Sequence, residues 1–363
     1  MYLENPFTPS FGEVPAHLAG RKQIVDDLLR AFSSERRRPE LTTLLSGARG
    51  TGKTTLLSLL AAKAESLGWA VVDTTALPGM LEDIEIGARR NASHLLKPAT
   101  RKVAGFEISP LGGMQLEPAE KPRDNWRFRI TDLLDQLEAA GSGLLVTVDE
   151  VDPALPDMVE LVAVYQHLIR EGRKVALLMA GLPHNISALL NDKTVSFLRR
   201  AQLFRLGRIA DYDVEAALVK TVVEQGRSID EPALAYAVDQ ISGFPFMLQL
   251  VGYRSWDINP SSSVISIDDV TAGAAQAKCE MDDRILGATY RELSAGDLEF
   301  LAAMLEDGDA SRISDIVTRL GKSDSSVSQF RRRLIDAGVI GERGRGVIGF
   351  ELPYFREYLE ERL

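Results

Sequence analysis

The chain has 363 residues, of which 45% are hydrophobic and 26% are charged, and its formal charge is −10. At roughly 150 residues per domain, this length predicts two or three folded domains and excludes a peptide or a single small fold. Cys279 is the only cysteine, so an internal disulfide is excluded. The four histidines show no metal-ligand spacing, which disfavours structural zinc.

The sequence has no feature of a membrane-spanning or secreted protein. Its longest apolar runs, such as Val175 to Ala180, are far shorter than the roughly 18 to 20 residues that a membrane helix needs. Residues 1–6 contain neither the basic nor the apolar region of a secretory signal. We therefore expect no membrane partner and a cytoplasmic location.

Charge is distributed unevenly along the chain. Residues 311–345 contain eight basic and four acidic side chains, so this segment carries +4 while the rest of the chain carries −14. The overall acidity argues against a protein that coats nucleic acid along its whole surface. The asymmetry instead indicates a C-terminal module with a different kind of partner.

The first half of the chain alternates between buried strands and helices. After an extended lead-in at residues 1–20, the predicted helices are Arg21 to Phe32, Thr54 to Leu67, Met80 to Leu96, Arg127 to Ala140 and Met158 to Glu171. The predicted strands are Leu41 to Ser46, Trp69 to Thr74, Leu144 to Val148, Val175 to Ala180 and Gln202 to Leu206. Such alternation is typical of an α/β fold, in which helices cover both faces of a parallel sheet.

Three further segments have different patterns. Residues 97–123 are rich in proline and glycine and are predicted to form an inserted hairpin or loop. From Tyr212 to Ile285 the period is helical throughout, which predicts a small helical lid. The pattern then changes to short helices and a terminal hairpin, so the predicted domains are 1–210, 211–288 and 289–363.

A phosphate-binding motif lies between the first strand of this sheet and the helix that follows it. The pattern G-x-x-x-x-G-K-[ST] is satisfied by Gly47, Ala48, Arg49, Gly50, Thr51, Gly52, Lys53 and Thr54, with Thr55 next in the helix. Glycines let the backbone N–H groups turn toward a triphosphate, and the helix adds its positive N-terminal end. We expect Lys53 to reach the β- and γ-phosphates and the Thr54 hydroxyl to bind Mg²⁺.

A pair of carboxylates follows the strand Leu144 to Val148. Asp149 is placed at the carboxyl end of that strand, where it can hold the hydration shell of Mg²⁺. Glu150 is then placed to orient or polarise the attacking water. Asp152 is expected to cap the next helix.

These motifs resemble those of the prokaryotic AAA+ or STAND-type P-loop ATPases of the origin-recognition-like group. The resemblance covers about residues 14–285 and rests on Leu18-Ala19-Gly20-Arg21, GARGTGKTT, LLVTVDE, VALLMAGLP and Gly243-Phe244-Pro245. It implies a P-loop NTPase fold that binds ATP with Mg²⁺. It also implies that Gly20 and Arg21 lie near the adenine and that Gly243 and Pro245 close over the nucleotide.

The chain departs from this family pattern at two positions. The position at which the family commonly has a polar sensor residue falls within Ala180-Gly181-Leu182, which has no polar side chain. His184 or Asn185 could substitute for that residue. The lid has no evident sensor arginine, and Gln249 is the polar residue nearest to the Gly-x-Pro turn. Hydrolysis is therefore a weaker expectation than binding.

Two arginines precede the fifth strand. In related ATPases an arginine in this place stabilises γ-phosphate charge, from its own or a neighbouring subunit. Arg199 and Arg200 are candidates for that role, and a solvated helix end is the alternative.

In the C-terminal segment, helices are predicted at Arg312 to Leu320 and Ser323 to Ala337, followed by a hairpin with a glycine-rich tip. This arrangement resembles a winged helix-turn-helix domain. Val327, Phe330 and Leu334 should face the module's core. The candidate contacts to double-stranded DNA are Ser325, Ser328, Gln329, Arg332, Arg343 and Arg345.

Two functions remain open from the sequence. The first is an ATP-dependent DNA-binding protein in which the nucleotide state controls the winged helix. The second is a STAND-like signalling or regulatory ATPase whose winged helix docks a protein, with self-association possible in either case. A metabolic kinase is disfavoured because no segment resembles an acceptor-substrate pocket.

Overall fold

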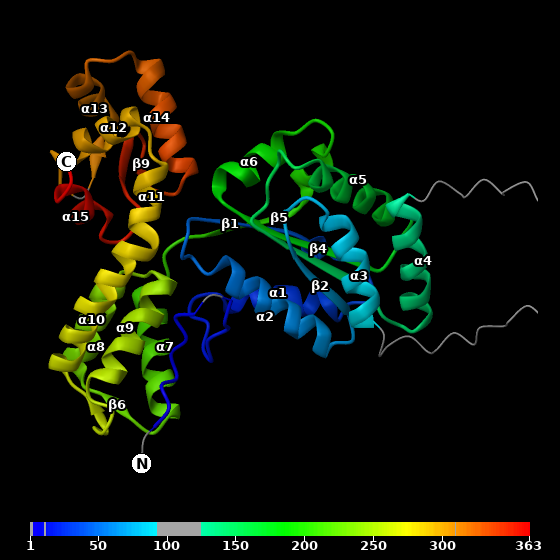
Figure 1. Ribbon diagram of the computed structural model, residues 1–363, viewed down its shortest axis with the longest axis horizontal. Helices are drawn as coiled ribbons and strands as arrows, with labels where there is room; N and C mark the ends of the chain where they lie inside the picture. The colour runs from blue at the N-terminus through cyan, green and yellow to red at the C-terminus, as the bar shows by residue number, and fades with distance from the viewer. Residues whose placement is uncertain (1–2, 11, 93–124, 309) are drawn as a thin grey trace, which may run out of the picture.

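The computed structural model describes residues 3–10, 12–92, 125–308 and 310–363. Its largest unit contains a parallel sheet of five strands in the order β2-β3-β4-β1-β5, which confirms the predicted α/β class (Figure 1). The strands are β1 Thr42–Gly47, β2 Ala70–Thr75, β3 Leu144–Asp149, β4 Val175–Gly181 and β5 Gln202–Leu206. Each lies within one or two residues of its predicted range.

Helices cover both faces of this sheet because successive strand residues point to opposite faces and apolar side chains lie on both. Leu45 packs with α1 Lys22–Phe32 and α2 Lys53–Ser66, whereas Leu44 faces the other layer. That layer contains α3 Met80–Ala92, α4 Trp126–Ala139, α5 Pro156–Arg170 and α6 Pro183–Asn191. The predicted insertion at residues 97–123 lies outside the described residues.

A helical lid follows the sheet. Its helices are α7 Asp211–Glu224, α8 Glu231–Ile241, α9 Pro245–Ile258 and α10 Ile267–Met281. The prediction of continuous helix was wrong at two short places, because β6 Ser228–Ile229 and β7 Val264–Ile265 pair in parallel at one end of the lid. Two-residue strands are too short to produce an alternating sequence pattern.

A continuous helix joins the lid to the C-terminal module. Helix α10 passes into a π-helical turn, Asp282–Leu286, and then into α11 Gly287–Glu292. Residue 289, the predicted domain boundary, lies inside this helix. The lid and the module are therefore connected through continuous helical backbone.

The C-terminal module has the arrangement expected of a winged helix. Helices α12 Ala295–Leu305, α13 Ile313–Leu320 and α14 Asp324–Asp336 precede β9 Ile340–Gly344, β10 Val347–Phe350 and the last helix α15 Phe355–Glu360. Strand β10 pairs antiparallel with both β9 and the short β8 Ser311–Arg312. The Ser323 side chain caps α14 by accepting from the backbone N–H of Ser326.

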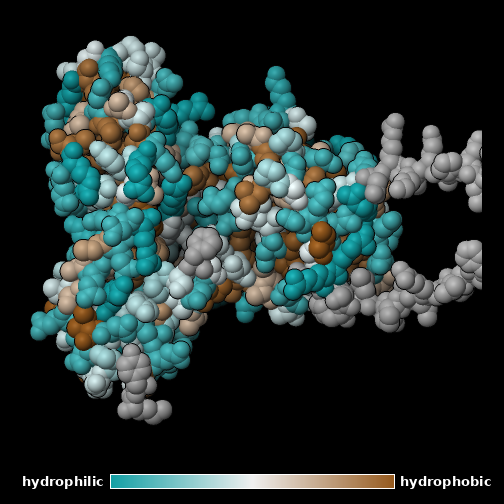
Figure 2. All heavy atoms as spheres, viewed as in Figure 1, coloured by the Kyte–Doolittle hydropathy of each residue, from teal (hydrophilic) through white to brown (hydrophobic). Residues whose placement is uncertain are grey.

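Apolar side chains gather into three buried clusters. Two lie on the opposite faces of the sheet, and the third runs through both the lid and the C-terminal module. The face shown in Figure 2 is mostly hydrophilic, with hydrophobic residues in scattered spots. Within the described ranges, no helix combines the length and apolarity required to cross a membrane.

Candidate functional site

The phosphate loop lies between the end of β1 and the start of α2. Gly50 and Gly52 have φ angles of +77° and +82°, which favour glycine. A Cβ atom on Gly50 would also lie 2.6 Å from the ring of Phe244. Both the backbone conformation and the lack of space therefore exclude a side chain at Gly50. The loop is held from within by Thr51, whose hydroxyl donates to the Ala48 carbonyl at 2.8 Å.

Lys53 is the cation at the centre of this loop. Its side chain is buried, and its Nζ donates to the carbonyl oxygens of Gly47 and Ala48, both at 3.0 Å. Burial lowers the pKa of Lys53, while the charges of Glu150 and Asp149 oppose that shift. The amine therefore lies in a position that favours an anionic partner.

Thr54 and Asp149 come together as the sequence predicts. The Thr54 hydroxyl donates to Oδ2 of Asp149 at 2.5 Å, which joins the start of α2 to the end of β3. Both side chains supply oxygen atoms, the donor type that Mg²⁺ prefers. In the described part of the chain, no group of three or more His, Cys, Asp or Glu side chains could hold a metal. The residues present fit a Mg²⁺ that takes its remaining ligands from phosphate and water.

Glu150 has a strained backbone. Its φ is +52°, a conformation that costs a residue with a side chain on the order of 1 kcal/mol or more. Its backbone N–H donates to Oδ1 of Asp149 at 2.9 Å. The side chain is exposed and lines the cavity next to the phosphate loop. Strain at such a position is typical of a functional site.

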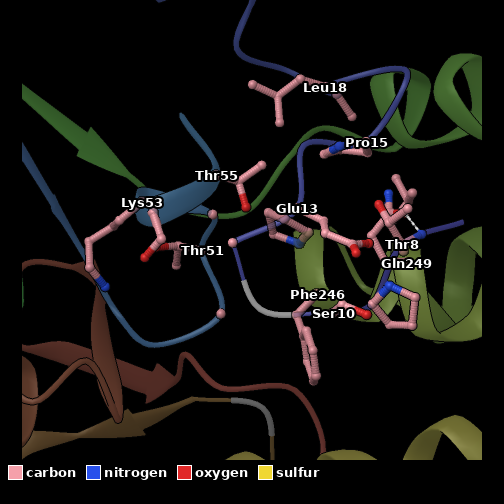
Figure 3. Close-up of a pocket in the computed structure, with 18 of the residues that line it drawn as sticks. Thr8, Ser10, Glu13, Pro15, Leu18, Thr51, Lys53, Thr55, Phe246 and Gln249 are labelled. Atoms are coloured by element: carbon pink, nitrogen blue, oxygen red, sulfur yellow. Dashed lines mark hydrogen bonds between the residues drawn. The ribbon is translucent and has the colours of Figure 1, made fainter. Parts of the chain in front are cut away.

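A cavity of about 450 Å³ extends from the phosphate loop. Its walls come from the loop, the N-terminal segment, Ile209 after β5, and the lid. In Figure 3, Lys53 lies at one end, and Thr8 and Gln249 lie at the other with Glu13 between them. The backbone N–H of Thr8 donates to Oε1 of Gln249 at 3.0 Å. A contact between the N-terminal segment and α9 thus bounds the cavity at this end.

Gly20 and Arg21 lie beside this cavity. Gly20 has a φ of +66°, and a Cβ atom there would lie 2.7 Å from Ile209. Arg21 lines the cavity and donates from Nη2 to the Gly207 carbonyl at 2.7 Å. Burial lowers the pKa of Arg21, and the charge of Asp213 opposes this.

The Gly-x-Pro turn brings the lid onto the phosphate loop. Gly243 has a φ of +68°, and a Cβ atom there would lie 2.4 Å from the Ile209 carbonyl oxygen. Pro245 is the first residue of α9 and lines the cavity. The next residue, Phe246, donates its backbone N–H to the Gly50 carbonyl at 3.3 Å.

The sensor and arginine candidates lie elsewhere. His184 is exposed at the start of α6, and its Nδ1 lies 3.2 Å from the Asp336 carbonyl oxygen at the end of α14. Arg199 and Arg200 belong to a 3₁₀ turn, Ser196–Arg200, and neither lines the cavity of its own chain. Arg199 donates to the Leu190 carbonyl at 3.0 Å. A role toward a neighbouring subunit stays a prediction for both arginines.

Some of the residues at this cavity have no local sequence signal. The N-terminal segment was predicted only as a lead-in, yet residues 8–10 and 12–19 supply Thr8, Glu13 and Leu18 to the wall. Arg284 lines the cavity from the π-helical turn, although the sequence shows no sensor arginine beside the Gly-x-Pro turn. The N-terminal segment and Arg284 both reach the cavity through contacts between distant parts of the chain.

The proposed DNA face lies on α14 and the wing. Ser325, Ser328, Gln329 and Arg332 are exposed, and Val327 and Leu334 are buried on the opposite side. Phe330 is partly buried against Gly296.

The arginines of this face differ in how they are paired. Arg332 is 76% exposed and lies 3.8 Å from Asp336, and Arg345 is exposed at the tip of the wing. Arg343 instead pairs with Glu351 at 2.8 Å and donates to the Phe350 carbonyl. Arg332 and Arg345 are thus the more accessible of the three cations.

Comparisons with known proteins give the same assignment for the nucleotide-binding part. Residues 17–178 match a family model described as an AAA ATPase domain. Residues 283–359 match a model described as a domain of unknown function. No curated protein matches the chain.

Solved structures match almost the whole chain. The Walker-type ATPase PABY2304 of Pyrococcus abyssi is 16% identical with a TM-score of 0.68, over 94% of this chain and 96% of that one. The ORC2 protein of Aeropyrum pernix, in ADPNP–ADP complexes, is 15% identical with a TM-score of 0.66, over 99% and 97%. Cdc6p from Pyrobaculum aerophilum is 16% identical with a TM-score of 0.51, over all of both chains. Residues 17–178 are therefore an AAA ATPase domain, in a chain whose overall fold is similar to that of archaeal Orc and Cdc6 proteins.

Proposed function

We propose that this protein is an ATP-hydrolysing, DNA-binding protein in which the bound nucleotide controls the position of the winged helix. The observation that carries this proposal is a direct contact between the phosphate loop and the C-terminal module. A Cβ atom on Gly338 would lie 2.5 Å from the Cβ of Ala48, the second residue of the loop. A rearrangement of the phosphate loop on nucleotide binding would therefore reach the module directly.

The residues of the phosphate site have distinct proposed roles. Lys53 binds the β- and γ-phosphates, and Thr54 and Asp149 hold Mg²⁺, which when bound neutralises phosphate charge. The Glu150 carboxylate orients a water and accepts its proton as the water oxygen bonds to the γ-phosphorus. The bond from that phosphorus to the bridging oxygen breaks, which leaves ADP and inorganic phosphate.

Two polar contacts accompany the packing of Ala48 on Gly338. Arg49 of the phosphate loop pairs with Glu292 at the end of α11, at 2.9 Å. His184 contacts the last residue of α14, as described above. Arg49 also lines the nucleotide cavity, so a triphosphate is a competing anionic partner for it. We therefore expect ATP to loosen the module from the phosphate loop.

The arrangement also limits access to the proposed DNA face. Gln329 and Arg332 line a cavity of about 480 Å³ together with Arg49 and His184. Part of α14, the helix of the proposed DNA face, thus faces the nucleotide-binding unit. Release of the module would move the nucleotide-binding unit away from these exposed side chains and make room for a duplex, so ATP should raise the affinity for DNA.

Gly338→Ala tests the contact with the phosphate loop, and Gly346→Ala is a matched control. Both glycines have a positive φ, +71° and +72°, but a Cβ on Gly346 meets no atom within 4 Å. We expect Gly338→Ala to lower the free energy of unfolding by about 1 to 3 kcal/mol more than Gly346→Ala, because only the former overpacks a contact. Denaturant unfolding measures this difference. Equal losses in the two variants would contradict a close contact at Ala48.

Neutralising the proposed phosphate contacts should reduce the salt dependence of DNA binding. Each contact between a cation and a DNA phosphate contributes about −0.9 to the slope of log K against log salt. Replacing Arg332, Arg343 and Arg345 with alanine should flatten that slope by roughly two to three units and weaken all duplexes alike. Fluorescence anisotropy over a salt series measures it.

Gln329→Ala is the matched variant for sequence preference. An amide contacts base edges and not phosphates, so this change should reduce discrimination among duplexes and leave the salt slope unchanged. An unchanged slope in the triple-arginine variant would contradict the phosphate contacts.

A signalling switch is the second candidate function. It is favoured by the internal pairing of several arginines in the module, since Arg331 pairs with Glu342 and Arg333 pairs with Asp297. Such pairing reduces the positive electrostatic potential with which the module can attract DNA. If the full-length protein ignores duplex DNA at low salt, with and without ATP, the winged helix is a protein-docking module instead.

A further inference from the structure

A second cavity lies between the lid and the C-terminal module. Its volume is about 410 Å³, close to the 450 Å³ of the nucleotide cavity, and among the described residues none lines both. Its walls come from the end of α8, the loop after β5, the wing and α15. A space of this size accommodates a small molecule and not a duplex. The proposed mechanism makes no use of it.

Three arginines from separate parts of the chain line this second cavity, namely Arg208, Arg343 and Arg356. Arg343 pairs with Glu351 at 2.8 Å, and Arg356 pairs with Glu360 at 2.9 Å. Neither of these two carboxylates lines the cavity. The cations therefore reach the cavity, while their acidic partners lie outside it.

Arg208 carries a charge that the described part of the chain leaves without an ion pair. Its Nη1 donates to Oγ of Ser242 at 3.1 Å, and its Nη2 lies 3.5 Å from the Glu351 carbonyl oxygen, which is long for a hydrogen bond. Both partners are neutral, and the carboxylate of Glu351 is bound by Arg343. Arg208 thus keeps donors for an anion, and Arg343 is a second cation beside it because both contact Glu351.

Strained backbone is a further feature of this cavity. Among the described residues, those other than glycine with a positive φ are Glu150, Ser242 and Tyr354, at +52°, +50° and +60°. Glu150 lines the nucleotide cavity, and the other two line the second cavity. Such conformations cluster at ligand clamps and switch regions, where the surrounding structure holds them in place. The second cavity shares this property with the candidate functional site.

The second cavity also contains hydrogen-bond acceptors. Asp239 and Glu357 line it. Burial raises the pKa of Tyr354, and the charges of Asp239 and Glu357 add to that shift, so both carboxylates lie near its hydroxyl. A carboxylate repels phosphate but accepts from a hydroxyl group. A ligand that fits both the arginines and the carboxylates carries a phosphate together with hydroxyl groups.

Two short segments separate the two cavities. Ile209 lines the nucleotide cavity and Arg208 lines the second cavity, and the same holds for Pro245 and Ser242. The segments are joined, because the backbone N–H of Ile209 donates to the Gly243 carbonyl at 2.7 Å. A ligand in the second cavity therefore contacts the turn that brings the lid onto the phosphate loop.

We propose that the second cavity binds a small phosphomonoester with hydroxyl groups, either a sugar phosphate or a nucleoside monophosphate, and that this ligand holds the C-terminal module in place. A guanidinium offers the paired donors that suit phosphate oxygens. The phosphate bridges Arg208, in the loop after β5, and Arg343, in the wing. This bridge opposes the release of the module by ATP. The opposition to ATP rests on the proposed function, whereas the binding site does not.

Calorimetric titration of the full-length protein with ribose 5-phosphate and with AMP tests the site. We expect ribose 5-phosphate to bind with a dissociation constant of about 1 mM or lower. Arg208→Ala should weaken it about ten- to a hundredfold, the range for a lost hydrogen bond to a charged group, and Arg208→Lys should weaken it less because the charge remains. Tighter binding of AMP would identify the ligand as a nucleotide, and equal binding would identify it as a sugar phosphate.

Two variants locate the bound probe. Arg205→Ala removes an exposed arginine of β5 that does not line the second cavity, and Lys53→Ala alters the phosphate loop. Both should bind ribose 5-phosphate as the wild type does. The site would be overturned if neither probe bound the wild type, if Arg208→Ala bound it equally well, or if either control variant lost binding to the same extent.

The effect on the nucleotide is measured with ADPNP and Mg²⁺, with and without saturating ribose 5-phosphate. We expect the dissociation constant of ADPNP to rise about fivefold or more in the wild type and to stay unchanged in Arg208→Ala. No rise in the wild type, or an equal rise in both proteins, would overturn the opposition to ATP. A wild-type protein that binds ribose 5-phosphate but not ADPNP would overturn the proposed function and leave the second site standing.

Discussion

Replacing Lys53 with alanine is expected to abolish productive binding of ATP. Lys53 is the side chain that the phosphate loop holds buried beside its own carbonyl groups, and burial already favours an anionic partner for it. The wild-type protein should gain about 2.7 kcal/mol of stability when ATP and Mg²⁺ are a hundredfold above the dissociation constant. The thermal melting shift with ligand measures this gain, and Lys53→Ala should show none.

Lys63→Ala is the control for the first prediction. Lys63 is an exposed residue on the same helix, α2, so its removal tests for a general effect of lost positive charge. On addition of ATP and Mg²⁺, the melting temperature of Lys63→Ala should rise as much as that of the wild type. Equal shifts in wild type and Lys53→Ala would contradict the assignment of the phosphate site.

Glu150→Gln is expected to retain ATP binding and to lose hydrolysis by roughly 10²- to 10⁴-fold. The amide keeps the shape of the side chain but removes the charge that accepts a proton from water. Single-turnover hydrolysis and the melting shift are measured on the same preparation. Hydrolysis at the wild-type rate would contradict the proposed role.

Variants of two neighbouring carboxylates distinguish the proposed role of Glu150 from a general effect of lost negative charge. Asp152→Asn removes an exposed carboxylate whose Oδ1 accepts from the backbone of Ala154, and it should hydrolyse ATP normally. Asp149→Asn should instead raise the Mg²⁺ concentration required for activity, because that side chain is bonded to Thr54.

Local patterns predict the elements of the sheet well. Buried runs such as Leu144 to Val148 and the helical period of α5 appear in the sequence because each element buries its own apolar face. The continuity from α10 to α11 could not be predicted in this way. The π turn shifts the helical period at Asp282–Leu286, so the pattern changes although the helix goes on.

In the candidate site too, residues set by local spacing could be predicted, whereas contacts between distant segments could not. Lys53, Thr54 and Asp149 could be predicted because fixed spacing at strand and helix ends places them together. The contact between Thr8 and Gln249 at one end of the cavity joins residues 241 positions apart. Such a contact depends on how the lid folds back on the N-terminal segment, and neither local propensity nor spacing encodes it.

The internal pairing of basic residues shows the same limitation. The net charge of residues 311–345 indicates a cationic module, but it does not distinguish a free arginine from a paired one. Arg343 was predicted as a DNA contact from its place at the wing, and it pairs with Glu351 across the hairpin. Its role in DNA binding stays a prediction that the salt series tests.

Duplex DNA binding by the full-length protein with ADPNP and Mg²⁺, with ADP and Mg²⁺, and without nucleotide tests the central claim most directly. If the triphosphate draws Arg49 away from Glu292 and so loosens the winged helix, the dissociation constant for DNA should fall at least about tenfold with ADPNP, or roughly 1.4 kcal/mol of coupling. Lys53→Ala should bind DNA with one affinity in all three conditions. A wild-type protein that binds duplex DNA equally well in all three conditions would contradict nucleotide control of the winged helix.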